Sequence, residues 1–124
     1  MALILVVDDE PMVLETLGRM LEKSGHMVEC AKDVESAVAA MSMRPPEIIF
    51  VDLVMPGTGG LTFIMENLSE QRHVAVIAMS GRIPVGTDSM LGLRSTLGIC
   101  AFLAKPFTSA ELAVVLDKAL KSLR

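Results

Sequence analysis

The chain has 124 residues, of which 52% are hydrophobic and 21% are charged, and its net charge is −4. This length predicts one domain, residues 1–124, with a hydrophobic core of its own and no room for a second domain. No window approaches the roughly 20 continuous apolar residues of a membrane span, and the acidic balance without a Lys/Arg run argues against a nucleic-acid-binding surface. Because the first strand is expected to begin at Ala2, we expect no signal peptide and a cytoplasmic location.

Short apolar runs alternate with helical patterns along the whole chain. Such runs predict five strands, at about 2–7, 27–31, 48–52, 74–79 and 100–104. Strands that alternate with helices are connected by right-handed crossovers, which place helices on both sides of a parallel sheet. The sequence therefore predicts an α/β fold with a doubly wound, five-stranded parallel sheet.

The helices are marked by their first and last residues. Pro11 opens the first helix and Gly25 ends it, with Leu14, Leu17 and Leu21 at helical spacing. Asp33 is the expected N-cap of the second helix, which ends before Pro45-Pro46 and should carry its apolar residues inward; these are Val34, Val38 and Met41.

The second half of the chain predicts three more helices. One is expected at about 60–70, and residues 81–98 predict a long loop followed by a short fourth helix. The last helix opens with Thr108 and Glu111 at the spacing of a capping box, and its apolar stripe consists of Leu112, Val115, Leu116, Ala119, Leu120 and Leu123.

Three short strings stand where an apolar run stops: Asp8-Asp9, Asp52 and Lys105-Pro106. The carboxyl ends of parallel strands line one edge of a sheet, so these acids and the lysine should converge there. Three close carboxylates repel one another unless a cation sits among them. The cluster therefore predicts a divalent-metal pocket, in which the lysine supplies a positive charge for a phosphoryl group.

Each of these residues taken alone has a simpler interpretation. Asp8 or Asp9 suits a helix N-cap before Pro11, and Asp52 suits a turn. Lys105 alone would be a solvated charge. It is their combination in this order that favours a metal and phosphoryl site.

With these motifs in order, the chain resembles a response-regulator receiver domain of two-component signalling systems. The resemblance covers essentially the whole chain and rests on VVDDEP at 6–11, VDLVMPGTGG at 51–60, Ser80-Gly81 after VAVIAM, and FLAKPF at 102–107. It implies the strand order 2-1-3-4-5, with the site at the topological switch point.

The resemblance also implies a role for each matching residue. Asp52 looks like the phosphoacceptor, a carboxylate that attacks phosphorus and becomes an acyl phosphate. Asp8, Asp9, Asp52 and the backbone carbonyl of Val54 would hold Mg2+, which prefers oxygen ligands. Lys105 matches the lysine that pairs with the phosphoryl oxygens, and Pro106 the proline that commonly follows a cis peptide bond.

Four further residues match positions that respond to the phosphoryl group. Ser80 resembles the hydroxyl that bonds to it, and Phe102 the aromatic side chain that moves with it. Val54 and Arg82 stand two positions after the phosphoacceptor and the switch hydroxyl, where side chains can orient the hydrolytic water. Val54 offers no hydrogen bond and Arg82 can only donate one, so we expect slow self-dephosphorylation.

The implied partners are a sensor histidine kinase or a histidine phosphotransfer protein, and an output protein that binds the surface of the fourth helix, fifth strand and fifth helix. This surface is where the chain departs from the family, because the stretch from Ser80 to Lys105 is about three residues longer than expected and contains Pro84 and Gly86. The fifth strand also lacks the acidic residues that support dimers in the winged-helix branch.

Two alternative functions follow from the same residues. An aspartate-nucleophile phosphatase of the haloacid-dehalogenase type would have two acids separated by one residue after the first strand. It is disfavoured because Asp8 and Asp9 are adjacent and the candidate nucleophile, Asp52, follows the third strand. A receiver fold that acts unphosphorylated as a binding module is disfavoured by the intact acidic set and Lys105.

We expect Cys30 and Cys100 to be buried free thiols, and assign no metal or catalytic role to His26 or His73.

Overall fold

The computed structural model describes residues 1–55, 57, 59–68, 73–81 and 98–123. In this part of the chain five parallel strands form one sheet in the order β2-β1-β3-β4-β5. Both the parallel direction and the strand order confirm the prediction. The strands are β1 (Leu3–Val7), β2 (Met27–Ala31), β3 (Ile48–Asp52), β4 (Ala75–Ser80) and β5 (Ile99–Ala104), each within one residue of the expected bounds.

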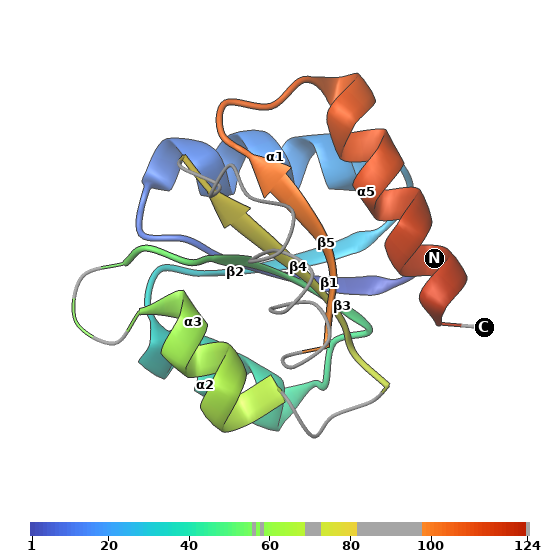
Figure 1. The fold of residues 1–124 in the computed structure, drawn as a ribbon. Helices are drawn as coiled ribbons and strands as arrows, with labels where there is room; N and C mark the ends of the chain where they lie inside the picture. The colour runs from blue at the N-terminus through green and yellow to red at the C-terminus, as the bar shows by residue number, and fades with distance from the viewer. Residues whose placement is uncertain (56, 58, 69–72, 82–97, 124) are drawn as a thin grey trace.

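Helices cover both faces of the sheet (Figure 1). The first face carries α1 (Pro11–Lys23) and α5 (Ser109–Ser122), and the second carries α2 (Val34–Met43) and α3 (Gly60–Phe63). A π-helical stretch, η1 (Ile64–Leu68), continues α3. None of the described helices is long and apolar enough to cross a membrane.

Alternation along the strands divides the core into two clusters, one on each face. In β1, Ile4 and Val6 pack toward α1 and α5, whereas Leu5 and Val7 pack toward α2 and α3. All four side chains are buried. Successive strand residues point to opposite faces, so a strand with apolar residues on both sides must lie between two helical layers.

The predicted helix starts are present. The Asp33 side chain accepts a hydrogen bond from the Ser36 N–H at 2.7 Å, and Thr108 and Glu111 form the reciprocal capping box. The third helix departs from expectation, because only its first four residues are α-helical before the π-helical stretch begins. The expected loop and fourth helix at 81–98 lie almost wholly outside the described residues.

Two expectations about side-chain burial are wrong. Val38 is 39% exposed, and the buried residue of α2 is Ala37. Cys30 is exposed and Cys100 is half-buried. Cys30 lies on β2, which is an edge strand with less cover. Cys100 is an extra residue in β5, since Val76 pairs with Ile99 and Ile77 with Ala101, as in a β-bulge.

Candidate functional site

The carboxyl edge of the sheet brings the predicted polar residues together. Val7 of β1 is paired with Val51 of β3, so Asp8 and Asp52, the next residue in each case, emerge side by side. Ser80 and Ala104 are paired at the ends of β4 and β5, and Lys105 follows directly. The register of the four strands therefore positions one site.

Asp8 and Asp52 hold their loops in the same way. The Oδ1 atom of Asp8 accepts a hydrogen bond from the Glu10 N–H at 2.9 Å, and Oδ1 of Asp52 accepts one from the Val54 N–H at 3.1 Å. For Asp52 this is the turn interaction that the simpler interpretation predicts. The N-cap expected at Asp8 or Asp9 is wrong, because the N-cap of α1 is Glu10. The second oxygen, Oδ2, of each aspartate faces Lys105. One oxygen thus shapes the loop and the other remains available to the site.

The Lys105 ammonium is the cation among these acids. Its Nζ atom lies 2.6 Å from Asp8 Oδ2, 3.1 Å from Asp52 Oδ2 and 3.5 Å from Glu10 Oε1. The side chain is only 12% exposed, and the Lys105 N–H donates to the Ser80 carbonyl at 2.9 Å. Backbone and side chain together orient this lysine into the site.

Burial and neighbouring charges shift the pKa values of Asp52 and Lys105. Burial raises the pKa of Asp52 and outweighs the Val54 N–H and Lys105, which both lower it. Burial alone would lower the pKa of Lys105, but contacts with Asp8 and Asp52 together raise it. The pKa of Asp52 is thus raised by burial, and that of Lys105 by its two carboxylate partners. One ammonium is shared by these two buried carboxylates. The pocket therefore holds more negative charge than Lys105 can neutralise.

The acidic cluster fits a divalent cation. Carboxylate oxygens of Asp8, Asp9, Glu10 and Asp52 lie within 4.8 Å of one another. Asp8 Oδ2 is buried, and its partner among the described residues is the Lys105 ammonium, which it shares with Asp52. One ammonium does not balance this group of carboxylates, and buried negative charge without a balancing cation is costly. Hard oxygen ligands of this kind suit Mg2+.

Glu10 is the member of the cluster that the sequence interpretation did not include. Its signal was its position, directly after Asp8-Asp9 at the end of β1. Glu10 is the N-cap of α1, but its side chain makes no capping hydrogen bond. The carboxylate points instead toward Lys105.

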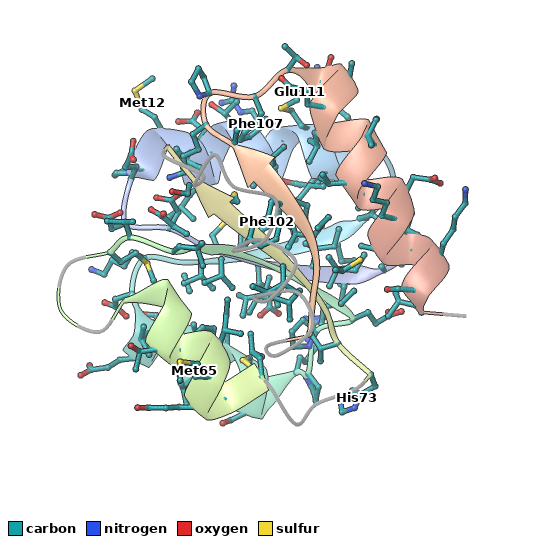
Figure 2. The ribbon with its side chains drawn as sticks, in the orientation of Figure 1. Met12, Met65, His73, Phe102, Phe107 and Glu111 are labelled. Carbon is teal, nitrogen blue, oxygen red and sulfur yellow. The ribbon has the colours of Figure 1, made fainter. Side chains whose placement is uncertain are left out.

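A cavity of about 550 Å³ opens beside Asp52 and Lys105. Its lining from α1 includes Met12, and its lining from the loop before α5 includes Phe107, both labelled in Figure 2. A mostly apolar lining with a few charged groups is typical of a small-ligand site. The cavity gives the site access to solvent.

Comparison with known proteins assigns this arrangement to a family. A family model described as "Response regulator receiver domain" matches residues 4–117. The chain belongs to this family. Receiver domains are parts of two-component response regulators and act as signalling switches rather than as classical enzymes.

Individual relatives agree with this assignment. The chain is 32% identical over 123 residues to the nitrogen assimilation regulatory protein NtrX of Azorhizobium caulinodans, which covers 98% of the chain but 26% of NtrX. It is 30% identical over 118 residues to the probable transcriptional regulatory protein TcrX of Mycobacterium tuberculosis, covering 95% of the chain and 49% of TcrX. The chain thus spans half or less of these relatives.

Solved structures agree with the fold. NtrX from Brucella abortus superposes with a TM-score of 0.85 at 31% identity, covering 98% of this chain and 27% of that one. The chemotaxis protein CheY4 from Vibrio cholerae gives a TM-score of 0.83 at 23% identity, covering 96% of this chain and 98% of that one.

The remaining predicted residues of this receiver domain have the following positions. Ser80 is buried at the end of β4, and Phe102 of β5 is half-buried against the cluster on the α2 and α3 face. The Val54 side chain is 73% exposed at the cavity. The Lys105–Pro106 peptide bond is cis, as the resemblance implies. Arg82 lies outside the described residues.

Proposed function

We propose that this receiver domain is a phosphorylation-dependent switch in which Asp52 accepts a phosphoryl group. The observation that carries the proposal is the position of Asp52 Oδ2, which lies 3.1 Å from the Lys105 ammonium beside the acidic cluster. Asp52 also lines the cavity through which a donor can approach. It is thus a carboxylate with one oxygen held by the backbone and the other directed at a cation.

In the proposed reaction, Asp52 Oδ2 forms a bond to phosphorus while the bond from phosphorus to the leaving group of the donor breaks. The leaving group keeps the electron pair of that bond. Lys105 would then pair with an oxygen of the new acyl phosphate, since its Nζ atom already lies beside Asp52. Because Oδ1 stays bound to the Val54 N–H, the nucleophile stays oriented during the transfer.

Mg2+ is the proposed cofactor, held by Asp8, Asp9, Asp52 and the backbone carbonyl of Val54. When bound, it would neutralise negative charge on the phosphoryl oxygens during transfer. The acidic cluster supports this assignment, because the Lys105 ammonium brings one positive charge to the carboxylates of Asp8, Asp9 and Asp52.

The switch is proposed to run through Ser80 and Phe102. Phosphorylation adds about −1.5 to −2 charge and strong acceptor oxygens at Asp52. The Ser80 hydroxyl would bond to this group from the end of the neighbouring strand β4, and Phe102, which is half-buried, would change its packing. The altered surface of the fourth helix, β5 and α5 would then bind the output partner.

The proposed donors are a sensor histidine kinase or a histidine phosphotransfer protein, and we propose a cytoplasmic location and a single domain over residues 1–124.

We also propose slow self-dephosphorylation. The Val54 side chain stands at the cavity beside Asp52 and offers no hydrogen bond to an incoming water. The decay of labelled protein after removal of the donor measures this rate.

The test is labelling by acetyl phosphate in Mg2+. Wild type should gain an acid-labile, hydroxylamine-sensitive phosphoryl group, and Asp52→Asn should lose it, because an amide is not a nucleophile here. Asp117→Asn is the matched control, since Asp117 is an exposed aspartate on α5 whose partner is Lys121. Full labelling of Asp52→Asn would show that another residue is the phosphoacceptor.

A further inference from the structure

Glu10 lies at the opening of the site, and among the described residues its carboxylate does not stabilise a helix end or a turn. Its side chain is 61% exposed and makes no capping hydrogen bond to α1. Its one ion-pair contact among the described residues, with Lys105, is long at 3.5 Å, and such exposed pairs contribute little to stability. Replacing this carboxylate should therefore leave the fold intact.

Glu10 is nevertheless close to the reacting atoms. One of its oxygens lies within 4.8 Å of a carboxylate oxygen of Asp52, and both residues line the cavity. Among the described residues of that lining, the charged ones are Glu10, Asp52 and Lys105. A donor that enters the cavity and reaches Asp52 must therefore place its phosphoryl group beside Glu10.

The charge at this opening depends on Glu10. With one divalent cation bound, this cation and Lys105 would together balance Asp8, Asp9 and Asp52, and Glu10 would leave the site with one net negative charge. A phosphoryl donor is itself an anion. Repulsion between two charges falls with distance and with salt, but it is substantial over a few ångströms.

We infer that Glu10 is a specificity-determining residue that disfavours small, highly charged phosphoryl donors such as acyl phosphates. This inference rests on the proposed function of Asp52. The penalty grows with the charge of the donor, so a dianion is slowed more than a monoanion. Glu10 thereby limits labelling of the switch by small acyl phosphates.

The test compares acetyl phosphate, a dianion at pH 7, with phosphoramidate, which is a monoanion there. At saturating Mg2+ and low salt, Glu10→Gln should raise the second-order rate constant about threefold to tenfold for acetyl phosphate and about twofold to threefold for phosphoramidate. In 1 M salt both gains should fall below about twofold. A residue that only supported the fold would not change the ratio of the two donors in this way.

Glu15→Gln is the matched control. Glu15 is an exposed glutamate on α1, with 62% of its side chain accessible, and it does not line the cavity. It should change neither rate constant. Equal gains for both donors in Glu10→Gln, or a gain that persists in 1 M salt, would overturn the inference.

Different experimental results would contradict the inference about Glu10 and the proposed function of Asp52. If wild type is labelled and Asp52→Asn is not, but Glu10→Gln matches wild type with both donors, only the inference is wrong. If Asp52→Asn is labelled as fully as wild type, the proposed function is wrong, and with it the basis for assigning Glu10 a role.

Discussion

The two helical layers of this receiver domain contribute differently to the site. On the first face, α1 and α5 are long helices that bury regular apolar stripes, with Leu17 and Leu21 from one and Leu112 and Val115 among those from the other. On the second face, α2 buries only Ala37, and α3 has four residues before the π-helical stretch (Figure 1). The first face thus buries stripes along two long helices, whereas the buried side chains of α3 and η1 on the second face include Phe63, Ile64 and Leu68.

The second layer, however, touches the proposed phosphoacceptor most directly. The helix α3 begins at Gly60, whose backbone lies against the carbonyl of Asp52. The first layer reaches the site through loops, at Glu10 before α1 and at Lys105 before α5. The second layer therefore imposes the tighter local constraint on Asp52.

The largest effect is expected at this contact. A Cβ atom at Gly60 would overlap the carbonyl oxygen of Asp52, so Gly60→Ala must displace either α3 or β3. We expect a loss of about 3 kcal/mol or more in the free energy of unfolding, measured by urea denaturation.

Gly59→Ala is the matched control. The added Cβ would lie 3.5 Å from the Leu53 carbonyl oxygen, an ordinary contact distance. We expect a change below about 1 kcal/mol. If Gly59→Ala destabilises the protein as much as Gly60→Ala, close approach to Asp52 is not the cause.

The next prediction compares a buried residue of α1 with an exposed residue of α2. Leu17 of α1 is fully buried, whereas Val38 of α2 is 39% exposed. Leu17→Ala should lower the free energy of unfolding by about 2–5 kcal/mol, because it leaves a cavity. Val38→Ala should lower it by less than about 1 kcal/mol. Similar losses in urea denaturation would contradict the exposed position of Val38.

The smallest effect is a pH dependence at the start of β1. The Ala2 N–H donates to His26 Nδ1 at 3.1 Å, which requires that nitrogen to be unprotonated. Burial, together with the charged N-terminus, lowers the pKa of His26, although Glu47 opposes this. The unfolded state therefore binds the proton more readily, and its His26 titrates near 6.5.

The sign of this effect follows from proton linkage. The contribution of His26 to stability is fully present above about pH 6.5 and is lost as the pH falls from there through its lower pKa in the folded protein. Urea midpoints at pH 7.5 and 5.5 should differ less in His26→Gln than in wild type. His73→Gln, the matched control, should keep the wild-type difference. An unchanged pH dependence in His26→Gln would exclude this role.

Much of the fold could be predicted because its signals are local and redundant. Each strand is a short apolar run, and Asp33 and Thr108 mark helix starts through hydrogen bonds to residues three positions later. Such interactions depend on spacing along the chain. The expectation that Val38 is buried was wrong because burial is not a local property. Helical spacing predicts the direction in which a side chain points, but not whether another element covers it.

The site likewise has features that the sequence determined and features that it did not. The sequence alone determined that Asp8, Asp52 and Lys105 lie at one edge, because parallel strands end together. It did not determine that each aspartate directs one oxygen to its loop and the other to Lys105, nor that Glu10 joins the cluster. Those features depend on side-chain rotamers and on contacts between Lys105 and Glu10, residues 95 positions apart in the chain. Only the packed sheet brings such residues within reach of one another, so the tertiary structure decided them.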